Sequence, residues 1–306
     1  MKVKIFERYR KPSPSPKISY RLHRAEFGHN VKTKKIPEYS YYPDTNNVIQ
    51  FISKYSKISK ENISIGLGAE SIIKDLFILL NQINKKRIFF LTPIFGMYQY
   101  YSNRFNFKIF SEKLYPGKKY YIEKKKKKIS NNNVNVLALV NPSHPIENYY
   151  DEKNLYKLIK FCESKNIFLI VDEVYNFKSI IPKKFLNYEN VIFIRSFSKT
   201  FGLPGLRLGY GIANKKLIKF LENFRLAIEV GSNTTNFLNN TKKTKLIILK
   251  NQNKIKQALR YAKENFKKRK ITFFNSRVNS ITFDCLTHNR REKIFKYLYN
   301  YKIYTL

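Results

Sequence analysis

One short segment of the chain combines an amine, two hydroxyls and a guanidinium. Ser196 and Ser198 precede Lys199, and Arg207 follows the lysine after a loop that contains two glycines. A lysine amine can form an imine with an aldehyde, and hydroxyl and guanidinium groups are natural partners of phosphate oxygens. The segment therefore has the groups to hold a small molecule that carries both an aldehyde and a phosphate.

A carboxylate and a phenol follow another apolar stretch. Asp172 comes directly after the apolar residues 167–171, and Tyr175 lies three residues further along. A carboxylate can keep a pyridine nitrogen protonated, so that the ring accepts electrons from a substrate, and a phenol can hydrogen-bond a ring oxygen. Each residue alone has a plain structural explanation, since the chain has 23 tyrosines and 60 lysines and arginines. Their co-occurrence favours a site for pyridoxal phosphate.

Both groups of polar residues follow short apolar runs. The runs cover residues 134–140, 167–171 and 191–194, and a helical pattern over 154–165 separates the first two. Buried strands that alternate with helices indicate a parallel sheet with covered faces. Ligands of such sheets bind at the carboxyl ends of the strands, where the polar clusters fall. The pattern predicts an α/β fold with a mostly parallel central sheet flanked by helices.

The flanking segments predict how the chain is divided. A glycine-rich turn at 66–70 leads into a helical pattern over 71–83, which places the turn at a helix N-terminus. Helical spacing also covers 215–228, and a smaller region ends with a strand candidate at 280–283 and a helix at 291–302. We expect an N-terminal arm over residues 1–30, a large cofactor-binding domain over 31–243, and a small, shortened C-terminal α/β domain over 244–306.

The formal charge of +39 invites a nucleic-acid interpretation, because clustered Lys and Arg neutralise phosphates. The composition offers a simpler one. Lys, Asn, Ile, Tyr and Phe are abundant, Trp is absent and Gly is scarce, as in the product of an AT-rich coding sequence. The lysine run at 124–128 is typical of a solvated loop or strand edge, with a specific binding patch as the alternative. We therefore expect no nucleic-acid partner.

The cysteines and the apolar stretches indicate a cytoplasmic protein. Cys162 and Cys285 lie far apart, which argues against a disulfide framework and a cysteine zinc site, and the four histidines lack metal-ligand spacing. No apolar stretch reaches the ~20 residues of a membrane helix, and the charged, proline-bearing start is unlike a signal peptide. We expect neither a metal nor a membrane partner.

Segment 196–210, SFSKTFGLPGLRLGY, resembles the lysine signature of the class I/II aminotransferases, which are fold-type-I pyridoxal-phosphate enzymes. The resemblance is nearest to the branch that contains histidinol-phosphate aminotransferases and threonine-phosphate decarboxylases. Five further segments match in the right order: YYPD at 41–44, GLGAES at 66–71, TPIFGMY at 92–98, NPSHP at 141–145 and DEVY at 172–175. Together the matches cover about residues 40–215.

The resemblance implies roles for the residues around the cofactor ring. Lys199 would hold the cofactor as an imine and later carry the proton between the substrate and the cofactor. Asp172 would pair with the pyridinium nitrogen, and Tyr175 would hydrogen-bond the phenolic oxygen. Tyr98 would stack on the ring.

The resemblance also implies a phosphate site and a shared active site. The phosphate would be bound by backbone N–H groups, hydroxyls and a guanidinium from Ala69, Glu70, Ser196, Ser198 and Arg207. Members of this family are similar in building each site at a dimer interface. Tyr42 of the YPD motif would therefore reach the phosphate of the partner in a homodimer.

The chain departs from the family pattern in two places. His144 stands where the family has an asparagine that donates to the phenolic oxygen. An imidazole N–H can make the same bond, although the change also fits altered chemistry or a structural histidine. The family's C-terminal arginine, which clamps the substrate carboxylate, has no counterpart before the final KIYTL. Arg21 or Arg24 could replace it, or the substrate could be a phosphorylated compound or a small amine.

Three functions remain open at this point. The leading one is an aminotransferase that acts on a small amino acid or on a phosphorylated or amino-alcohol substrate. The same lysine, aspartate and tyrosine would also serve a decarboxylase of an amino acid or amino-acid phosphate, since substrate contacts decide which bond breaks. A non-catalytic basic binding protein that kept an ancestral fold is the third, and the intact set of site residues argues against it.

Overall fold

The computed structural model describes residues 20–21, 42–115, 121–178, 180–274, 277–301 and 303–304. Most of the predicted N-terminal arm, including Arg24, lies outside these residues. Of the arm, the short strand β1 (Tyr20–Arg21) is described, and it pairs in parallel with β11 (Ile303–Tyr304). The side chain of Arg21 lies outside the described part of the chain.

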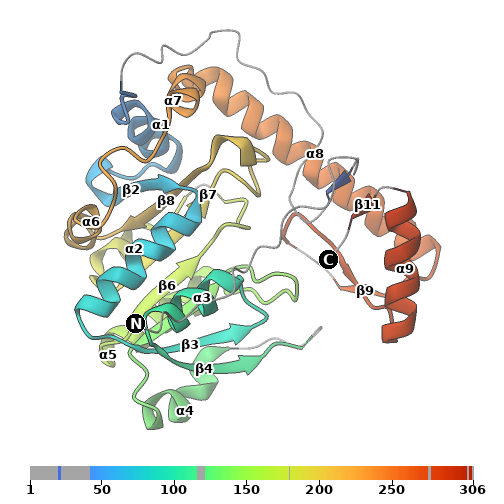
Figure 1. Ribbon diagram of the computed structural model, residues 1–306, viewed down its shortest axis with the longest axis horizontal. Coiled ribbons are helices and arrows are strands. Elements are labelled where there is room, and N and C mark those ends of the chain that lie inside the picture. The colour runs from blue at the N-terminus through green and yellow to red at the C-terminus, as the bar shows by residue number, and fades with distance from the viewer. Residues whose placement is uncertain are drawn as a thin grey trace, which may run out of the picture.

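A seven-stranded sheet forms the centre of the molecule (Figure 1). Its strands, in spatial order, are β2 (Ile63–Leu67), β8 (Leu208–Ala213), β7 (Val191–Ser196), β6 (Phe168–Asp172), β5 (Val136–Val140), β3 (Arg87–Thr92) and β4 (Lys108–Lys113). Strands β3 to β7 run parallel, whereas β8 is antiparallel to both of its neighbours. The predicted α/β fold with a mostly parallel sheet is confirmed.

Helices cover both faces of this sheet. They are α1 (Asn46–Ser56), α2 (Ala69–Gln82), α3 (Gly96–Arg104), α4 (Lys126–Asn131), α5 (Glu152–Ser164), α6 (Lys215–Glu222) and α7 (Ser232–Asn239). Side chains alternate across the strands, so β5 buries Leu137 and Leu139 with α1 and α5, and Val136 and Ala138 with α2, α3 and α6. The result is two apolar cores, one on each side of the sheet.

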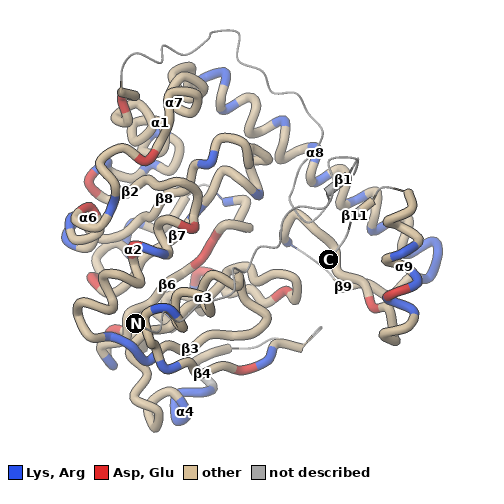
Figure 2. The backbone as a smooth tube through the Cα atoms, in the orientation of Figure 1, with Lys and Arg blue, Asp and Glu red and all other residues tan. Residues whose placement is uncertain are grey.

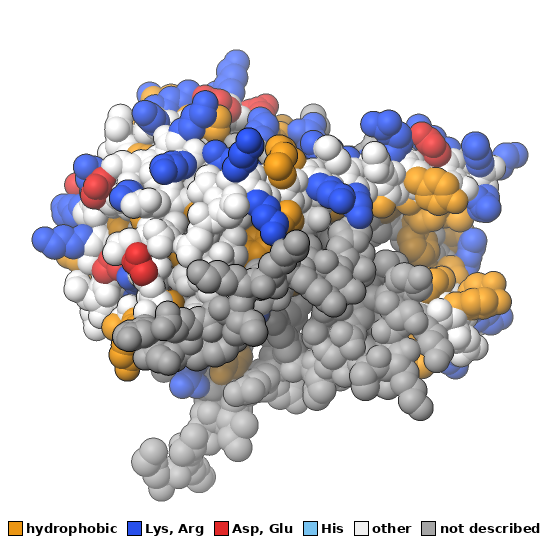
Figure 3. All heavy atoms as spheres, turned by 90° about the horizontal axis from the view of Figure 1, so that it is seen from above, with side chains coloured by type: hydrophobic (Ala, Val, Ile, Leu, Met, Phe, Trp, Pro, Cys, Tyr) orange, Lys and Arg blue, Asp and Glu red, His pale blue; other side chains and the backbone are white. Residues whose placement is uncertain are grey.

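A smaller region follows the sheet in the chain. Helix α8 (Thr241–Lys268) begins beside α7 and runs to β9 (Phe273–Phe274), β10 (Thr282–Phe283) and α9 (His288–Asn300), as Figure 1 shows. Strands β9 and β10 pair antiparallel. Lys and Arg recur along α8 and α9 (Figure 2). On the face seen in Figure 3, Lys and Arg are spread over the described surface.

The predicted elements around the sheet are largely confirmed, with two corrections. The helix predicted over 215–228 ends at Glu222, where the N–H groups of Asn223 and Phe224 donate to the carbonyls three residues back (3.2 and 3.0 Å) in place of the α-helical pattern. The lysine run at 124–128 is helical rather than a loop or strand edge, although residues 126–128 are exposed as expected. Among the described residues, no helix is long and apolar enough to cross a membrane.

Candidate active site

Strand pairing brings the predicted site residues to one edge of the sheet. Asp172 ends β6, where it lies between Val140 of β5 and Ile194 of β7. Ser196 ends β7 and pairs with Gly209 at the start of β8. Because β8 runs in the opposite direction, its first residues share this edge with the carboxyl ends of β2, β5, β6 and β7.

The carboxyl group of Asp172 is the most buried acid at this edge, with 1% of its surface exposed. The hydroxyl of Tyr98 donates to its Oδ2 (3.0 Å) and the N–H of Val174 donates to its Oδ1 (3.1 Å). Burial raises the pKa of Asp172 to about 6 against the effect of these hydrogen bonds, with a smaller contribution from the charge of Glu173. A cationic group placed beside this carboxyl would be held strongly.

Tyr98 has a different position from the predicted one. Its ring has no exposed surface and packs against Phe77, while its hydroxyl contacts Asp172. Burial, with the adjacent Asp172, raises its pKa well above the usual value. A ring without an open face cannot stack on a cofactor, so Tyr98 is corrected from a stacking residue to a partner of Asp172. Phe95, half-buried just before α3, is the aromatic residue of this turn that keeps exposed surface.

His144, Tyr175 and Lys199 meet at the same edge. The rings of His144 and Tyr175 are stacked, with centroids 4.7 Å apart and planes 21° apart. The Nζ of Lys199 lies 5.9 Å from the centroid of the Tyr175 ring. Burial, and secondarily the positive charge of Lys199, lowers the pKa of His144 to about 4, so its imidazole is neutral at pH 7. A neutral imidazole offers one N–H donor and one acceptor nitrogen.

The loop that carries His144 is pinned at both ends. The side chain of Asn141 bonds the backbone of Tyr150 twice, donating to its carbonyl (3.0 Å) and accepting from its N–H (2.8 Å). The hydroxyl of Ser143 accepts from the N–H of Asn148 (2.6 Å). These bonds satisfy buried polar groups and fix the loop, so the position of His144 is set by the NPS residues before it.

The start of α2 and the start of β8 form a second cluster. Gly68 precedes α2 with φ of +76°, a conformation that favours glycine. A Cβ on Gly68 would lie 3.1 Å from the Nη2 of Arg207, and a Cβ on Gly209 would lie 2.3 Å from the N of Ala69. The guanidinium of Arg207 therefore lies beside the residue that precedes α2. Because Gly209 has no side chain, β8 can pack closely against the start of this helix.

This cluster has the properties of an anion site. Ala69 and Glu70 are the first residues of α2, whose N-terminal N–H groups and dipole favour negative charge. The hydroxyl of Ser196 accepts from the N–H of Ser198 (3.1 Å) in the turn that leads to Lys199. Together with Arg207, these groups have the chemistry to bind a phosphate.

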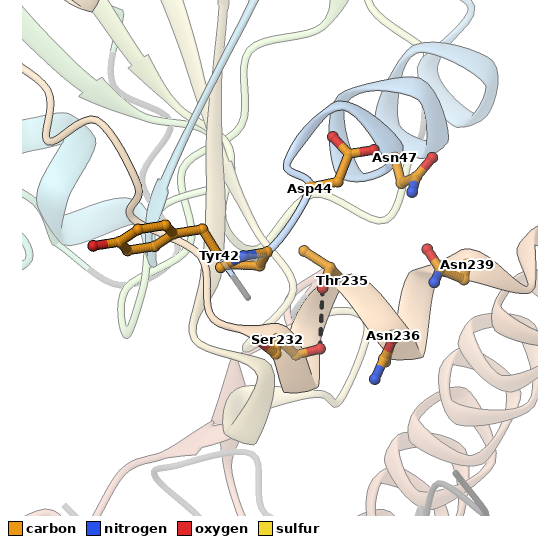
Figure 4. Close-up of a pocket in the computed structure, with 8 residues that line it drawn as sticks. Tyr42, Asp44, Asn47, Ser232, Thr235, Asn236 and Asn239 are labelled. Carbon is orange, nitrogen blue, oxygen red and sulfur yellow. Dashed lines mark hydrogen bonds between the residues drawn. The ribbon is translucent and has the colours of Figure 1, made fainter. Parts of the chain in front are cut away.

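Tyr42 lies in a separate place. It is 87% exposed and, with seven other residues, lines an open polar hollow of about 200 Å³ between the start of α1 and helix α7 (Figure 4). The other lining residues are Pro43, Asp44, Asn47, Ser232, Thr235, Asn236 and Asn239. Its phenol ring points away from Asn236 and Asn239 in Figure 4. The hollow contains none of the other predicted site residues.

Sequence reasoning missed several buried polar residues that contact the segments carrying the site. Glu173 and Arg195 form a buried ion pair (2.7 Å) beside Asp172, and Glu229 contacts Leu67 and Ser71 next to the start of α2. The one available signal for the first pair was an arginine inside the apolar strand β7. Such a charge needs a buried partner.

A family model identifies the group of proteins to which the chain is related. The model of "Aminotransferase class I and II" matches residues 12–306. The histidinol-phosphate aminotransferase of Ruminiclostridium cellulolyticum is 30% identical over 215 residues, a match that covers 64% of this chain and 56% of that protein. The chain thus spans little more than half the length of this relative.

Solved structures share the fold. The histidinol-phosphate aminotransferase from Clostridium acetobutylicum has a TM-score of 0.72 at 22% identity, over 87% of this chain and 80% of that one. The L-threonine-O-3-phosphate decarboxylase from Porphyromonas gingivalis has a TM-score of 0.58 at 18% identity, over 78% and 70%. At these identities the likeness concerns the fold alone. The family model, which matches nearly the whole chain, shows that the chain belongs to the class I and II aminotransferases, as its motifs predict.

Proposed function

We propose that this chain is a pyridoxal-phosphate aminotransferase in which Lys199 carries the cofactor through a Schiff base. One observation carries the proposal: the Lys199 amine lies beside the stacked His144 and Tyr175 rings, on the sheet edge that also bears Asp172 and Arg207. When bound, pyridoxal phosphate supplies an aldehyde for an amine and a ring that accepts electrons from the substrate's α carbon.

The residues at the ring end fit this cofactor. A buried carboxyl whose pKa stands at about 6 ionises readily once a cation is placed against it, so Asp172 would hold the pyridine nitrogen protonated. The neutral His144 would donate its N–H to the phenolic oxygen in place of the usual asparagine, next to the Tyr175 hydroxyl. Lys199 Nζ would accept and return the proton of the substrate's α carbon.

The residues at the other end fit a phosphate. Arg207 brings a full positive charge to the first turn of α2, where N–H groups of Ala69 and Glu70 begin the helix. Ser196 and Ser198 would add hydroxyl donors. We also propose a homodimer in which Tyr42, exposed on its own subunit, completes the phosphate site of the partner.

Several finer points remain predictions. One is the division into an arm, a large domain and a small domain at residues 30 and 243. Another is the cytoplasmic location, which is supported by Cys162 and Cys285, since neither forms a disulfide. The substrate would be a small amino acid or a phosphorylated or amino-alcohol compound. The curated relative, a histidinol-phosphate aminotransferase, makes histidinol phosphate the first compound to test.

A product assay tests the proposal. With histidinol phosphate or amino acids as donors and a 2-oxo acid as acceptor, we expect transfer of the amino group. In the Lys199→Ala variant the transamination rate should fall by about 10²- to 10⁴-fold or more, because the general acid–base group is lost. Lys215→Ala removes an exposed lysine of α6 and should keep full activity. Release of carbon dioxide and amine instead would identify a decarboxylase. Activity that survives in Lys199→Ala would refute the assignment.

A further inference from the structure

A buried ion pair lies directly behind the candidate site. Glu173 follows Asp172 in the chain and is 6% exposed, and Arg195 of the neighbouring strand β7 is 4% exposed. The guanidinium donates to Glu173 Oε2 through both Nε (2.9 Å) and Nη2 (2.7 Å). Buried charges are costly unless they are paired and hydrogen-bonded, so this pair is maintained against a desolvation penalty.

The other oxygen of Glu173 holds the turn that carries Tyr175. Glu173 Oε1 accepts from the side-chain amide of Asn176 (2.9 Å), and the Asn176 N–H donates to the Glu173 carbonyl (2.9 Å). Asn176 Oδ1 in turn accepts from the N–H of Lys178 (3.0 Å), which fixes the orientation of the amide. Tyr175 thus lies in a turn that is held by the bond between Val174 and Asp172 and by side-chain bonds that run from Asn176 through Glu173 to Arg195.

A carboxylate suits this position in a way that an amide does not. Glu173 accepts from Arg195 on one oxygen and from Asn176 on the other, and both partners are donors only at these atoms. A glutamine has one acceptor oxygen, so its NH₂ group would face one of the two donors. Asn176 could not adapt by flipping without losing its bond to Lys178.

We propose that Glu173 and Arg195 are positioning residues, which hold the turn at 172–176 so that the Tyr175 ring lies against His144 and beside Lys199. The consequence for catalysis rests on the proposed function, but the positioning itself does not. It can be measured on protein without cofactor, so the two can fail separately.

The NMR titration of His144 reports whether the Tyr175 ring still covers it. The chain has four histidines, and isotope labelling of histidine with a His144→Gln variant for assignment gives the NMR signal of His144. We expect its titration midpoint near 4 in the native chain. In Asn176→Ala, and equally in Glu173→Gln, the released turn uncovers His144, and the midpoint should rise toward the ordinary 6.5. The double variant should add little, because both changes break the same connection.

The matched control is Glu222→Gln, which breaks an ion pair with Arg225 of the same length (2.7 Å) at the end of α6. It should leave the His144 signal unchanged. If Glu173→Gln does not fold, Asn176→Ala decides alone, because Asn176 is half-buried and its loss leaves the ion pair intact. A His144 midpoint that stays near 4 in folded Asn176→Ala, or one that moves as much in Glu222→Gln, would overturn the proposal.

Discussion

Two helices of equal length behave very differently in this molecule. Helix α5 and helix α9 each have 13 residues, and both have apolar residues at helical spacing. Helix α5 lies against the sheet and buries five side chains: Leu155, Leu158, Ile159, Phe161 and Cys162. None of the 13 residues of α9, all of which the structure describes, is buried. Tyr297 in the helix and Tyr301 directly after it are both 62% exposed.

The difference shows which region of the fold is stabilised most by the packing of buried side chains. Apolar residues at helical spacing give a helix an apolar face, but this face is buried only when another element packs against it. The central sheet packs against the apolar face of α5. The candidate site lies on the same sheet, so its polar groups are held by a dense core. The region of α9 has no comparable core among its described residues. We expect substitutions to have large effects near the sheet and small effects near α9.

The largest expected effect comes from the same substitution in both helices. Leu158→Ala removes a fully buried side chain from the core under α5 and should lower the free energy of unfolding by about 2 to 5 kcal/mol. Leu298→Ala, in half-buried surroundings on α9, should lower it by at most about 1 kcal/mol. Urea denaturation of the two variants measures both values. Equal losses would mean that α9 packs as tightly as α5, and the comparison would fail.

The next effect concerns a carboxyl in each region. Without cofactor, Asp172→Asn should raise the free energy of unfolding at pH 8 by about 2 kcal/mol. Burial raises the pKa of this group from 3.8 to about 6, and each pKa unit is worth about 1.4 kcal/mol. The asparagine gives back about 1 kcal/mol of this, because its single acceptor oxygen cannot replace both hydrogen bonds that Asp172 accepts from Tyr98 and Val174. Asp284→Asn, at an exposed position before α9, should change it by less than about 0.5 kcal/mol.

The pH dependence gives the sign of the Asp172 effect. Between pH 4 and 6 the folded chain holds a proton that the unfolded chain has lost, so the native stability falls as the pH rises through this window. The asparagine variant lacks this fall. The gain should therefore grow from pH 4 to 6 and stay constant above it. A variant that is less stable than the native chain at pH 8 would contradict the raised pKa of the buried Asp172 carboxyl.

A smaller effect tests the approach of α2 to β8. Gly209→Ala would place a Cβ 2.2 Å from the carbonyl carbon of Gly68, and we expect a loss of about 1 to 3 kcal/mol together with weaker cofactor binding. Gly205→Ala, only four residues away, has no atom within 4 Å of the new Cβ and should change stability by less than about 0.5 kcal/mol. Thermal unfolding and a cofactor titration report both. If Gly209→Ala keeps its stability and its cofactor binding, the start of α2 can move away from β8 without cost, and the close approach is not required.

Much of the fold near the sheet could be predicted from the sequence. The apolar runs before Asp172 and Ser196 became β6 and β7, and the glycine turn became the start of α2, because buried parallel strands leave continuous apolar runs and helix starts leave glycine and acidic residues. Residues that end such strands must share an edge. That rule alone predicts that Asp172 and Lys199 lie at the same edge of the sheet.

Other features depend on contacts that local patterns do not encode. The role of Tyr98 was wrong because a motif gives its position in the chain but not the direction of its ring. The apolar spacing over 215–228 continues past the end of the helix at Glu222, and residues beyond it are held by other contacts, such as the bond from the Leu226 N–H to Glu229. The pairing of Glu173 with Arg195 joins two strands, and only the folded sheet brings them together.

The identity of the reactive lysine is the central claim, and trapping the cofactor tests it most directly. Protein incubated with pyridoxal phosphate and reduced with borohydride should carry one added cofactor, and peptide mapping should place it on Lys199 among the many lysines of the chain. The label should vanish in Lys199→Ala and persist in Lys215→Ala. A label that spreads over surface lysines, or one that remains in Lys199→Ala, would contradict the proposed site.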